Sequence, residues 1–291
     1  LRILRLLRFT RIFRQIPLDK GYHINTTILK EKLKEDKQNG LNPFLIIGSA
    51  GTTDTGVIDD LHVLSILAEK YDCWFHVDAA YGGFFYMLDD LKIKFKGIET
   101  ADSLVIDPHK GLFLPYGSGA ILVKDRKFLL QSNHYIANYM QDSYKHQKHL
   151  SPADLSPELS RNFRGLRMWL PLMYHGTQVF VDALEEKILL TNYTYTKLGD
   201  LEYIQLGPSP ELSIFTFRFI LPNKKNVNKE NKELLTRIHN DGKIFISSTT
   251  IDENIWLRVA ILSFRTHRKE VDILIEMVKK HFYEYSISLT A

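Results

Sequence analysis

Two side chains in the first half of the chain have the types and spacing to do chemistry on a cofactor. Asp78 closes the apolar run CWFHV, and Lys110 comes after a later apolar run, directly behind Asp107, Pro108 and His109. A lysine amine can form a Schiff base with an aldehyde, and a carboxylate can keep a pyridine nitrogen protonated. Pyridoxal phosphate needs both groups, so we expect Lys110 and Asp78 to hold this cofactor.

Small residues and a second polar segment accompany this pair. Ala79, Ala80, Gly82 and Gly83 follow the acid, and their size would let a flat ring lie against the backbone. The segment GTTDTG at 51–56 follows another apolar run. The combination is far more specific than an isolated acid and lysine.

The same region also allows a metal alternative. His76, Asp78 and His109 match the ligand set of a non-haem iron facial triad. Such sites are found on jelly-roll barrels, whereas the helical spacing between Ile58 and Asp72 favours a parallel α/β fold. We therefore expect no metal site.

The elements that must position these residues are strands alternating with helices. Apolar runs at 43–50, 73–80 and 101–108 predict three strands, the segment 58–72 has helical spacing, and 114–125 predicts a turn and a fourth strand. Strand interiors that are continuously apolar indicate a mostly parallel sheet covered on both faces. In such α/β sheets, sites gather at the carboxyl ends of the strands.

The second half predicts a loop, a long helix and a smaller α+β unit. The polar stretch 131–156 lacks periodicity and predicts a functional loop. A helical pattern covers 161–198, with Pro171 as the expected kink. We expect a large domain at 1–197 and a small C-terminal domain at 198–291. Its predicted elements are strands at 212–221, 243–251 and 255–262, helices at 233–242 and 269–285, and a charged loop at 223–232.

Composition places the chain among ordinary globular proteins. Its 291 residues are 44% hydrophobic, 12% aromatic and 25% charged, which excludes disordered and collagenous classes. The net charge of +4 is too small to indicate a nucleic-acid partner, and no apolar run is long enough to span a membrane. The single cysteine, Cys73, cannot form an internal disulfide, so we expect a reducing, cytoplasmic setting.

The first residues allow two interpretations. The opening LRILRLLRFTRIFRQIP has arginine at every third position from Arg2 to Arg14. This pattern is compatible with a transit peptide or a membrane-surface helix. Because the stretch has no small-residue cleavage site and continues directly into domain-like sequence, we favour the interior of a longer chain.

Four segments resemble successive signatures of one enzyme family. GSAGTTDTGVIDDL, FHVDAAYGG, ADSLVIDPHKGLFLPYGSGAILVKD and LSRNFRGLRMWLPL resemble the pyridoxal-phosphate-dependent group II amino-acid decarboxylases, which include aromatic-L-amino-acid, tyrosine, histidine and glutamate decarboxylases. Their order and spacing match over essentially the whole chain. The resemblance implies a fold type I, aspartate-aminotransferase-like chain that starts partway through the large domain and forms a homodimer. It implies decarboxylation of an L-amino acid to an amine and carbon dioxide, and it favours an aromatic amino acid.

The resemblance also assigns cofactor contacts. Lys110 would form the Schiff base and Asp78 would pair with the pyridine nitrogen. Ala80 would pack on one face of the ring, and Thr53 would lie beside the ring hydroxyl.

Four further positions follow from the resemblance. Asp107 and His109 flank the lysine near the phosphate, although many relatives have asparagine where Asp107 stands. Tyr116 falls where family members with aromatic substrates place a phenylalanine that faces the substrate. Arg258 matches an arginine near the active site, with a salt bridge between domains as the alternative.

Two questions stay open at this level. Tyr139 and Tyr144 are candidates for the loop tyrosine that protonates the carbanion, and loop chemistry separates decarboxylation from oxidative deamination to an aldehyde. Relatives bring a phosphate loop and a stacking histidine from sequence upstream of Leu1. An inactive paralogue that serves as a dimerisation module is therefore an alternative.

Overall fold

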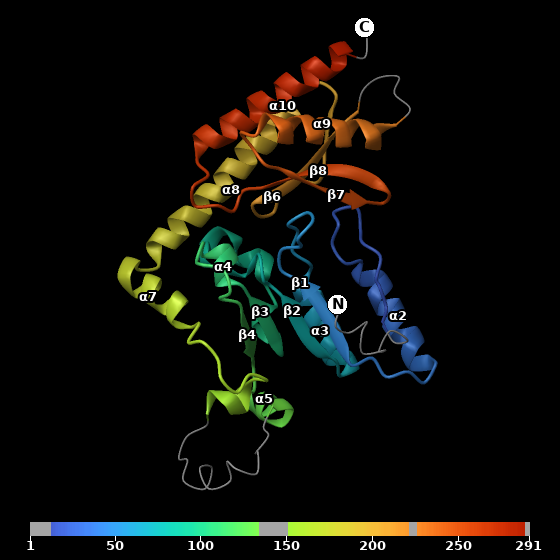
Figure 1. The fold of residues 1–291 in the computed structure, drawn as a ribbon. Coiled ribbons are helices and arrows are strands. Elements are labelled where there is room, and N and C mark those ends of the chain that lie inside the picture. Colours follow the sequence, from blue (N-terminus) through green and yellow to red (C-terminus); the bar gives the residue numbers. More distant parts are fainter. Residues whose placement is uncertain (1–12, 134–150, 221–225, 289–291) are drawn as a thin grey trace.

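The computed structural model of the chain describes residues 13–133, 151–220 and 226–288. Its first sheet has the strand order β1-β2-β3-β4 (Figure 1). Strands β1 to β3 are parallel and β4 is antiparallel to β3, so the mostly parallel sheet is confirmed. The strands are β1 Leu45–Ser49, β2 Trp74–Asp78, β3 Ser103–Ile106 and β4 Ala120–Val123.

Helix α3 (Leu61–Tyr71) connects β1 and β2 and covers one face of the sheet. Asp60 caps its start by accepting from the Val63 amide, and Asp72 ends it in the left-handed region. Leu61, Leu64 and other apolar residues of the helix are buried against the sheet. Helix α2 (Thr26–Gln38), which the sequence pattern did not predict, precedes β1 and is capped by Asn25.

Short helices follow β2, β3 and β4 in this half. They are η2 Gly83–Met87, η3 Asp89–Phe95, η4 Ile98–Thr100, α4 Pro108–Gly111, α5 Arg126–Asn133 and η6 Pro152–Leu155. Because α4 follows β3 directly, the turn that carries Lys110 lies at the carboxyl end of that strand.

The long helix expected at 161–198 is two helices, and the break between them lies at Gly176, five residues after the expected kink at Pro171. Pro171 lies inside α7 (Leu166–His175), and the helix ends at Gly176, whose amide donates to the Leu172 carbonyl. Gly176 has a φ of 74°, which favours glycine and reverses the helical path. Helix α8 (Gln178–Gly199) then begins in a new direction (Figure 1).

The second sheet is antiparallel throughout, with the order β5-β6-β8-β7. Figure 1 shows α8, α9 and α10 on one side of it. The strands are β5 Ile204–Leu206, β6 Ile214–Phe219, β7 Ser247–Ile251 and β8 Asn254–Ala260, and the helices are α9 Val227–Asp241 and α10 Arg268–Ser288.

Two predictions in this half need correction. Strand β7 begins at Ser247, not at residue 243, and α9 begins at Val227 within the stretch expected to be a charged loop. Asn226 caps α9 by accepting from the Lys229 amide. Asn231 is fully buried and bonds both the amide and the carbonyl of Phe219, which fixes this polar segment as a helix against β6.

The apolar side chains form two clusters, and α8 contributes to both. Phe180 and Leu184 pack with the first sheet, whereas Leu190 and Leu198 pack with the second. The helix therefore physically couples the two packed units. The domain boundary at 197/198 stays a prediction.

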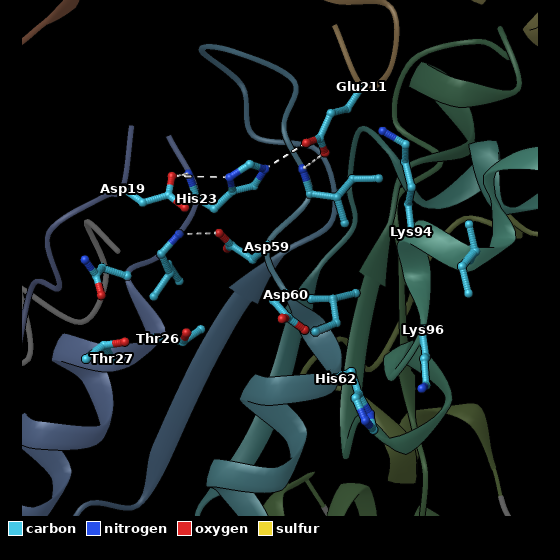
Figure 2. A pocket seen from close by; sticks show the side chains of 15 residues that line it. Asp19, His23, Thr26, Thr27, Asp59, Asp60, His62, Lys94, Lys96 and Glu211 are labelled. Atoms are coloured by element: carbon cyan, nitrogen blue, oxygen red, sulfur yellow. Dashed lines mark hydrogen bonds and ion pairs between the residues drawn. The ribbon is translucent and has the colours of Figure 1, made fainter. Parts of the chain in front are cut away.

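Polar contacts also join the two halves beside a cavity of about 620 Å³. Figure 2 shows His23 between Asp19 and Glu211 at this cavity. The His23 ring nitrogens lie 2.7 Å from Glu211 Oε1 and 3.3 Å from Asp19 Oδ1, and the Ile58 amide donates to Glu211 Oε2 at 2.8 Å. None of the residues that line this cavity belongs to the predicted site.

These contacts shift the ionisation of both partners. The hydrogen bond to Glu211 raises the pKa of His23 from 6.5 to about 9, against the opposing effect of burial. Burial opposes the ionisation of Glu211, but the bonds from His23 and Ile58 lower its pKa overall. The charged pair therefore stabilises the fold most strongly at pH values between the ordinary pKa of a glutamate and that of a histidine.

We expect His23→Gln to flatten the pH dependence of stability. Because the folded-state pKa of His23 is raised, its contribution is complete below pH 6.5 and is lost as the pH rises through about 9. With its partial exposure discounted, the contribution is about 1–2 kcal/mol. Urea unfolding at pH 6.5 and 9 measures it. His62→Gln, in the same cavity, is the control. If the free energy of unfolding changed equally between pH 6.5 and pH 9 in both variants, the contribution assigned to His23 would be contradicted.

Candidate active site

The carboxyl ends of the parallel strands bring Asp78 and the Lys110 turn to one edge of the first sheet. Asp78 is the last residue of β2 and is in register with Ser49 of β1 and Val105 of β3. Beyond the strands, the Asp107 amide donates to the Ala80 carbonyl at 3.2 Å. The two segments singled out from the sequence are therefore joined through the backbone.

The Asp78 carboxylate is exposed at this edge. Its Oδ1 accepts from the Ala80 amide at 3.1 Å, and among the described residues it makes no ion pair. The acid thus presents a negative charge that is available to a cationic group. This is the property needed to pair with a protonated pyridine nitrogen.

Lys110 lies in α4, one short helical turn after β3. Pro108 occupies the first position of this turn, where a missing amide hydrogen costs nothing. The Lys110 Nζ lies 2.8 Å from Asp107 Oδ2. A Cβ at Gly111 would meet Phe84 at 2.8 Å, so glycine there allows α4 to pack against η2.

His109 supplies an unsatisfied polar atom next to the lysine. Its side chain is 10% exposed, and its Nδ1 is buried with no hydrogen-bond partner among the described residues. A buried orphan atom of this kind is typical of a site that a ligand completes. Together with the Asp78 carboxylate and the Lys110 amine, it fits pyridoxal phosphate, which has a phosphate, a pyridine nitrogen and an aldehyde.

The small residues after Asp78 mostly serve chain packing. Ala79 is fully buried, a Cβ at Gly82 would overlap the Ala50 carbonyl, and a Cβ at Gly83 would meet Ile106 at 2.8 Å. Ala80 and Gly83 are partly exposed, whereas Ala79 and Gly82 are buried. That these small residues let a flat ring lie against the backbone stays a prediction, with Ala80 as the candidate ring contact.

Arg258 in β8 reaches across to the loop at 51–56. Its Nε donates to the Thr53 carbonyl at 2.7 Å, and its Nη1 donates to Ser247 Oγ at 3.2 Å. The alternative of a salt bridge between domains is not what the described residues show, because no carboxylate lies within ion-pair distance of this guanidinium. Burial lowers the pKa of Arg258. Thr53 itself is exposed beside this contact.

Tyr116 lies beside His109 but is 85% exposed. The two rings meet edge to face with centroids 4.7 Å apart, and Arg167 donates to the Tyr116 carbonyl at 3.0 Å. The structure thus brings Tyr116 to the lysine turn. Tyr139 and Tyr144 lie outside the described residues.

The described residues do not bring together an iron-binding triad. The His76 Nδ1 lies 2.7 Å from Ser103 Oγ, which also accepts from the Trp74 indole at 2.8 Å. Within the described ranges, no group of three histidine, cysteine or acidic side chains is arranged to hold a metal ion. In the same ranges, no helix is both long and apolar enough to cross a membrane.

Sequence reasoning missed Tyr81. Its hydroxyl accepts from the Ser213 amide at 2.9 Å and lies 2.7 Å from the Ser213 hydroxyl, and its ring covers Gly51 at the start of the polar loop. Burial raises its pKa. One signal in the sequence could have identified Tyr81. It is a tyrosine within a largely apolar segment, and a buried hydroxyl needs a hydrogen-bond partner.

Comparison with known proteins identifies the family. Residues 5–220 match the pyridoxal-dependent decarboxylase conserved domain. The chain belongs to the pyridoxal-dependent decarboxylase family. This finding confirms the resemblance stated from the sequence motifs, and with it the lyase class and pyridoxal phosphate cofactor of the family.

Individual relatives place the chain within that family. The aromatic-L-amino-acid decarboxylase of Bacillus atrophaeus is 32% identical over 278 residues, covering 94% of this chain and 58% of that protein. The phenylacetaldehyde synthase of Petunia hybrida is 28% identical over 284 residues, covering 92% of this chain and 56% of that protein. The chain thus spans little more than half the length of these two relatives.

A solved structure confirms the fold class. The crystal structure of Oryza sativa TDC with PLP and tryptamine superposes with a TM-score of 0.90 at 22% identity, over 97% of this chain and 60% of that chain. The chain therefore has the α/β fold type I architecture predicted from its sequence.

We expect Tyr81→Phe to destabilise this decarboxylase-family chain by about 1–3 kcal/mol, because the buried Ser213 amide loses its acceptor. The free energy of unfolding in urea measures the loss. Tyr86→Phe is the matched control, since Tyr86 is 42% exposed and its removal should cost less than about 0.5 kcal/mol. Equal stabilities of the two variants would show that the hydrogen bond between the Tyr81 hydroxyl and the Ser213 amide does not stabilise the fold.

Proposed function

We propose that this chain is part of an enzyme that decarboxylates an aromatic L-amino acid with pyridoxal phosphate. Lys110 carries the cofactor and Asp78 pairs with its ring nitrogen. The observation that supports this most strongly is the backbone bond from Asp107 to Ala80, which joins the lysine turn to the segment after Asp78. The relative from Bacillus atrophaeus, named for aromatic amino acids, favours the substrate class.

The other predicted residues would contact the ring and the phosphate of the cofactor. Pyridoxal phosphate, when bound, supplies an electron sink for the pair of electrons left by the departing carboxylate. The negative charge of Asp78 favours a protonated ring nitrogen and so strengthens that sink. The orphan Nδ1 of His109 is available to the phosphate, and Ala80 and Thr53 are available to the ring.

Substrate recognition is assigned to Arg258 and Tyr116. Arg258 is a half-buried cation without an ion-pair partner among the described residues, and such a group favours a carboxylate ligand. Tyr116 offers an exposed aromatic face next to His109, which suits an aromatic side chain.

An aldehyde synthase is the second candidate. The phenylacetaldehyde synthase of Petunia hybrida matches this chain over a similar length. Product analysis separates the two reactions, because decarboxylation yields an amine and the aldehyde-forming reaction does not. A homodimer, a cytoplasmic location and a proton-donating role for Tyr139 or Tyr144 stay predictions, and an inactive dimerisation module is the outcome if no cofactor binds.

We expect the 291-residue chain to bind pyridoxal phosphate in equilibrium dialysis, and Asp78→Asn to weaken binding about 10- to 100-fold. The reason is the loss of one charge-assisted bond. Asp90→Asn, an exposed acid on η3, is the control and should bind as the wild type does.

Substrate tests use the same preparations. With L-tryptophan, L-tyrosine and L-phenylalanine, we expect release of carbon dioxide and amine by the wild type, and none by Lys110→Ala. Binding that is unaffected by both Lys110→Ala and Asp78→Asn would contradict the proposed site. Aldehyde in place of amine would support the second candidate.

A further inference from the structure

Ser103 and His76 form a hydrogen-bonded pair on the sheet face that also carries Asp78. His76 and Asp78 are two residues apart in β2, so their side chains leave the strand on the same face. Ser103 of β3 is in register with His76, and its hydroxyl oxygen lies 2.7 Å from the His76 Nδ1. The pair is therefore a neighbour of the acid that we assign to the ring nitrogen of the cofactor.

The hydrogen-bonding groups of Ser103 determine the direction of this bond. The Trp74 indole, which can only donate, donates to the Ser103 Oγ at 2.8 Å. The hydroxyl hydrogen of Ser103 then remains for the His76 Nδ1. If Nδ1 carried a proton, this hydrogen would have no acceptor among the described residues, and Ser103 is only 6% exposed. The bond therefore favours a neutral imidazole whose single proton is on Nε2.

The surroundings of His76 also oppose a positive charge on its ring. The ring lines a cavity of about 530 Å³ at this sheet face. The residues that line this cavity or flank His76 in register are uncharged, and they are Phe44, Leu45, Ile47, Trp74 and Ser103. Burial lowers the pKa of His76, although the negative charge of Asp78 acts in the opposite direction. Within the described ranges, Asp78 is thus the ionised group that acts on His76.

From this geometry we propose that Ser103 is a positioning residue that keeps His76 neutral and so leaves the Asp78 carboxylate free for the cofactor. A protonated His76 would be a cation on the same strand face as this carboxylate and would compete with the pyridine nitrogen for it. The bond that Ser103 donates to Nδ1 has to break before Nδ1 can take up a proton, so it opposes this competition. The benefit to Asp78 rests on the proposed function, whereas the state of His76 does not.

The titration of His76 in the cofactor-free chain tests the proposal. NMR spectra of the ¹⁵N-labelled chain report which ring nitrogen carries the proton, and His76→Gln identifies the signals of His76 among those of the 11 histidines. In the wild type at mildly alkaline pH we expect a proton on Nε2 and none on Nδ1. In Ser103→Ala we expect the pKa of His76 to rise by about 0.5–1, as for the loss of one hydrogen bond to the neutral ring.

Two variants provide matched controls for this titration. Ser103→Thr keeps a hydroxyl and should restore the wild-type pKa of His76. Ser65→Ala removes a hydroxyl that donates to the His62 carbonyl in α3, and it should leave the pKa of His76 unchanged.

Equilibrium dialysis with pyridoxal phosphate measures the consequence for Asp78. Near pH 6, where the variant carries more protonated His76, Ser103→Ala should bind the cofactor about two- to fivefold more weakly than the wild type does, as for competition by one partly exposed ion pair. At about pH 9, where His76 is neutral in both proteins, the two should bind equally.

The outcomes distinguish this proposal from the proposed function. A wild-type His76 with its proton on Nδ1, or an unchanged His76 pKa in folded Ser103→Ala, would overturn the role of Ser103 even if pyridoxal phosphate binds to Lys110. A raised pKa with wild-type binding near pH 6 would also overturn it, because Asp78 would not be affected. If the wild type binds no cofactor, the proposed function fails, and the NMR titration still decides whether Ser103 keeps His76 neutral. If Ser103→Ala does not fold, the proton position in the wild type decides.

Discussion

The parallel register of β1, β2 and β3 is the constraint on which the site depends. Because the three strands run in one direction, Asp78 and the turn after β3 reach the same edge of the sheet. The backbone bond from Asp107 to Ala80 then ties the two exits together. If β2 or β3 ran in the opposite direction, Asp78 and Lys110 would lie at opposite edges of the sheet, separated by the length of a strand.

Residues in the C-terminal part of the chain contact the segments that follow β1 and β2. Arg258 holds the Thr53 carbonyl, the Thr249 hydroxyl donates to the Asp54 carboxylate at 2.8 Å, and Tyr81 bonds Ser213. Each contact joins the C-terminal part of the chain to a segment that follows β1 or β2. These contacts hold the loop at 51–56 and the segment after Asp78 in place. Substitutions at these contacts in the C-terminal part of the chain should therefore alter the positions of residues in the site.

Much of this arrangement was predictable from the sequence because it depends on local patterns. Continuous apolar runs gave the strands of the first sheet, and the residue types at their ends indicated Asp78 and Lys110. What the sequence hides are partners far apart in the chain, such as Arg258 and Thr53, and elements too short for a period, such as α4. The start of helix α9 was obscured because its charged first residues resemble a loop. The Asn226 cap and the buried contacts of Asn231 with Phe219 show why this segment is helical.

The central claim is that Lys110 is the residue that carries pyridoxal phosphate at this strand edge. The most direct test is to incubate the 291-residue chain with the cofactor, reduce it with borohydride and locate the pyridoxyl group by peptide mass spectrometry. Our account predicts a single modified peptide containing Lys110, and no selective modification in Lys110→Ala. Modification of a different lysine at equal or higher yield in the folded wild type would contradict it.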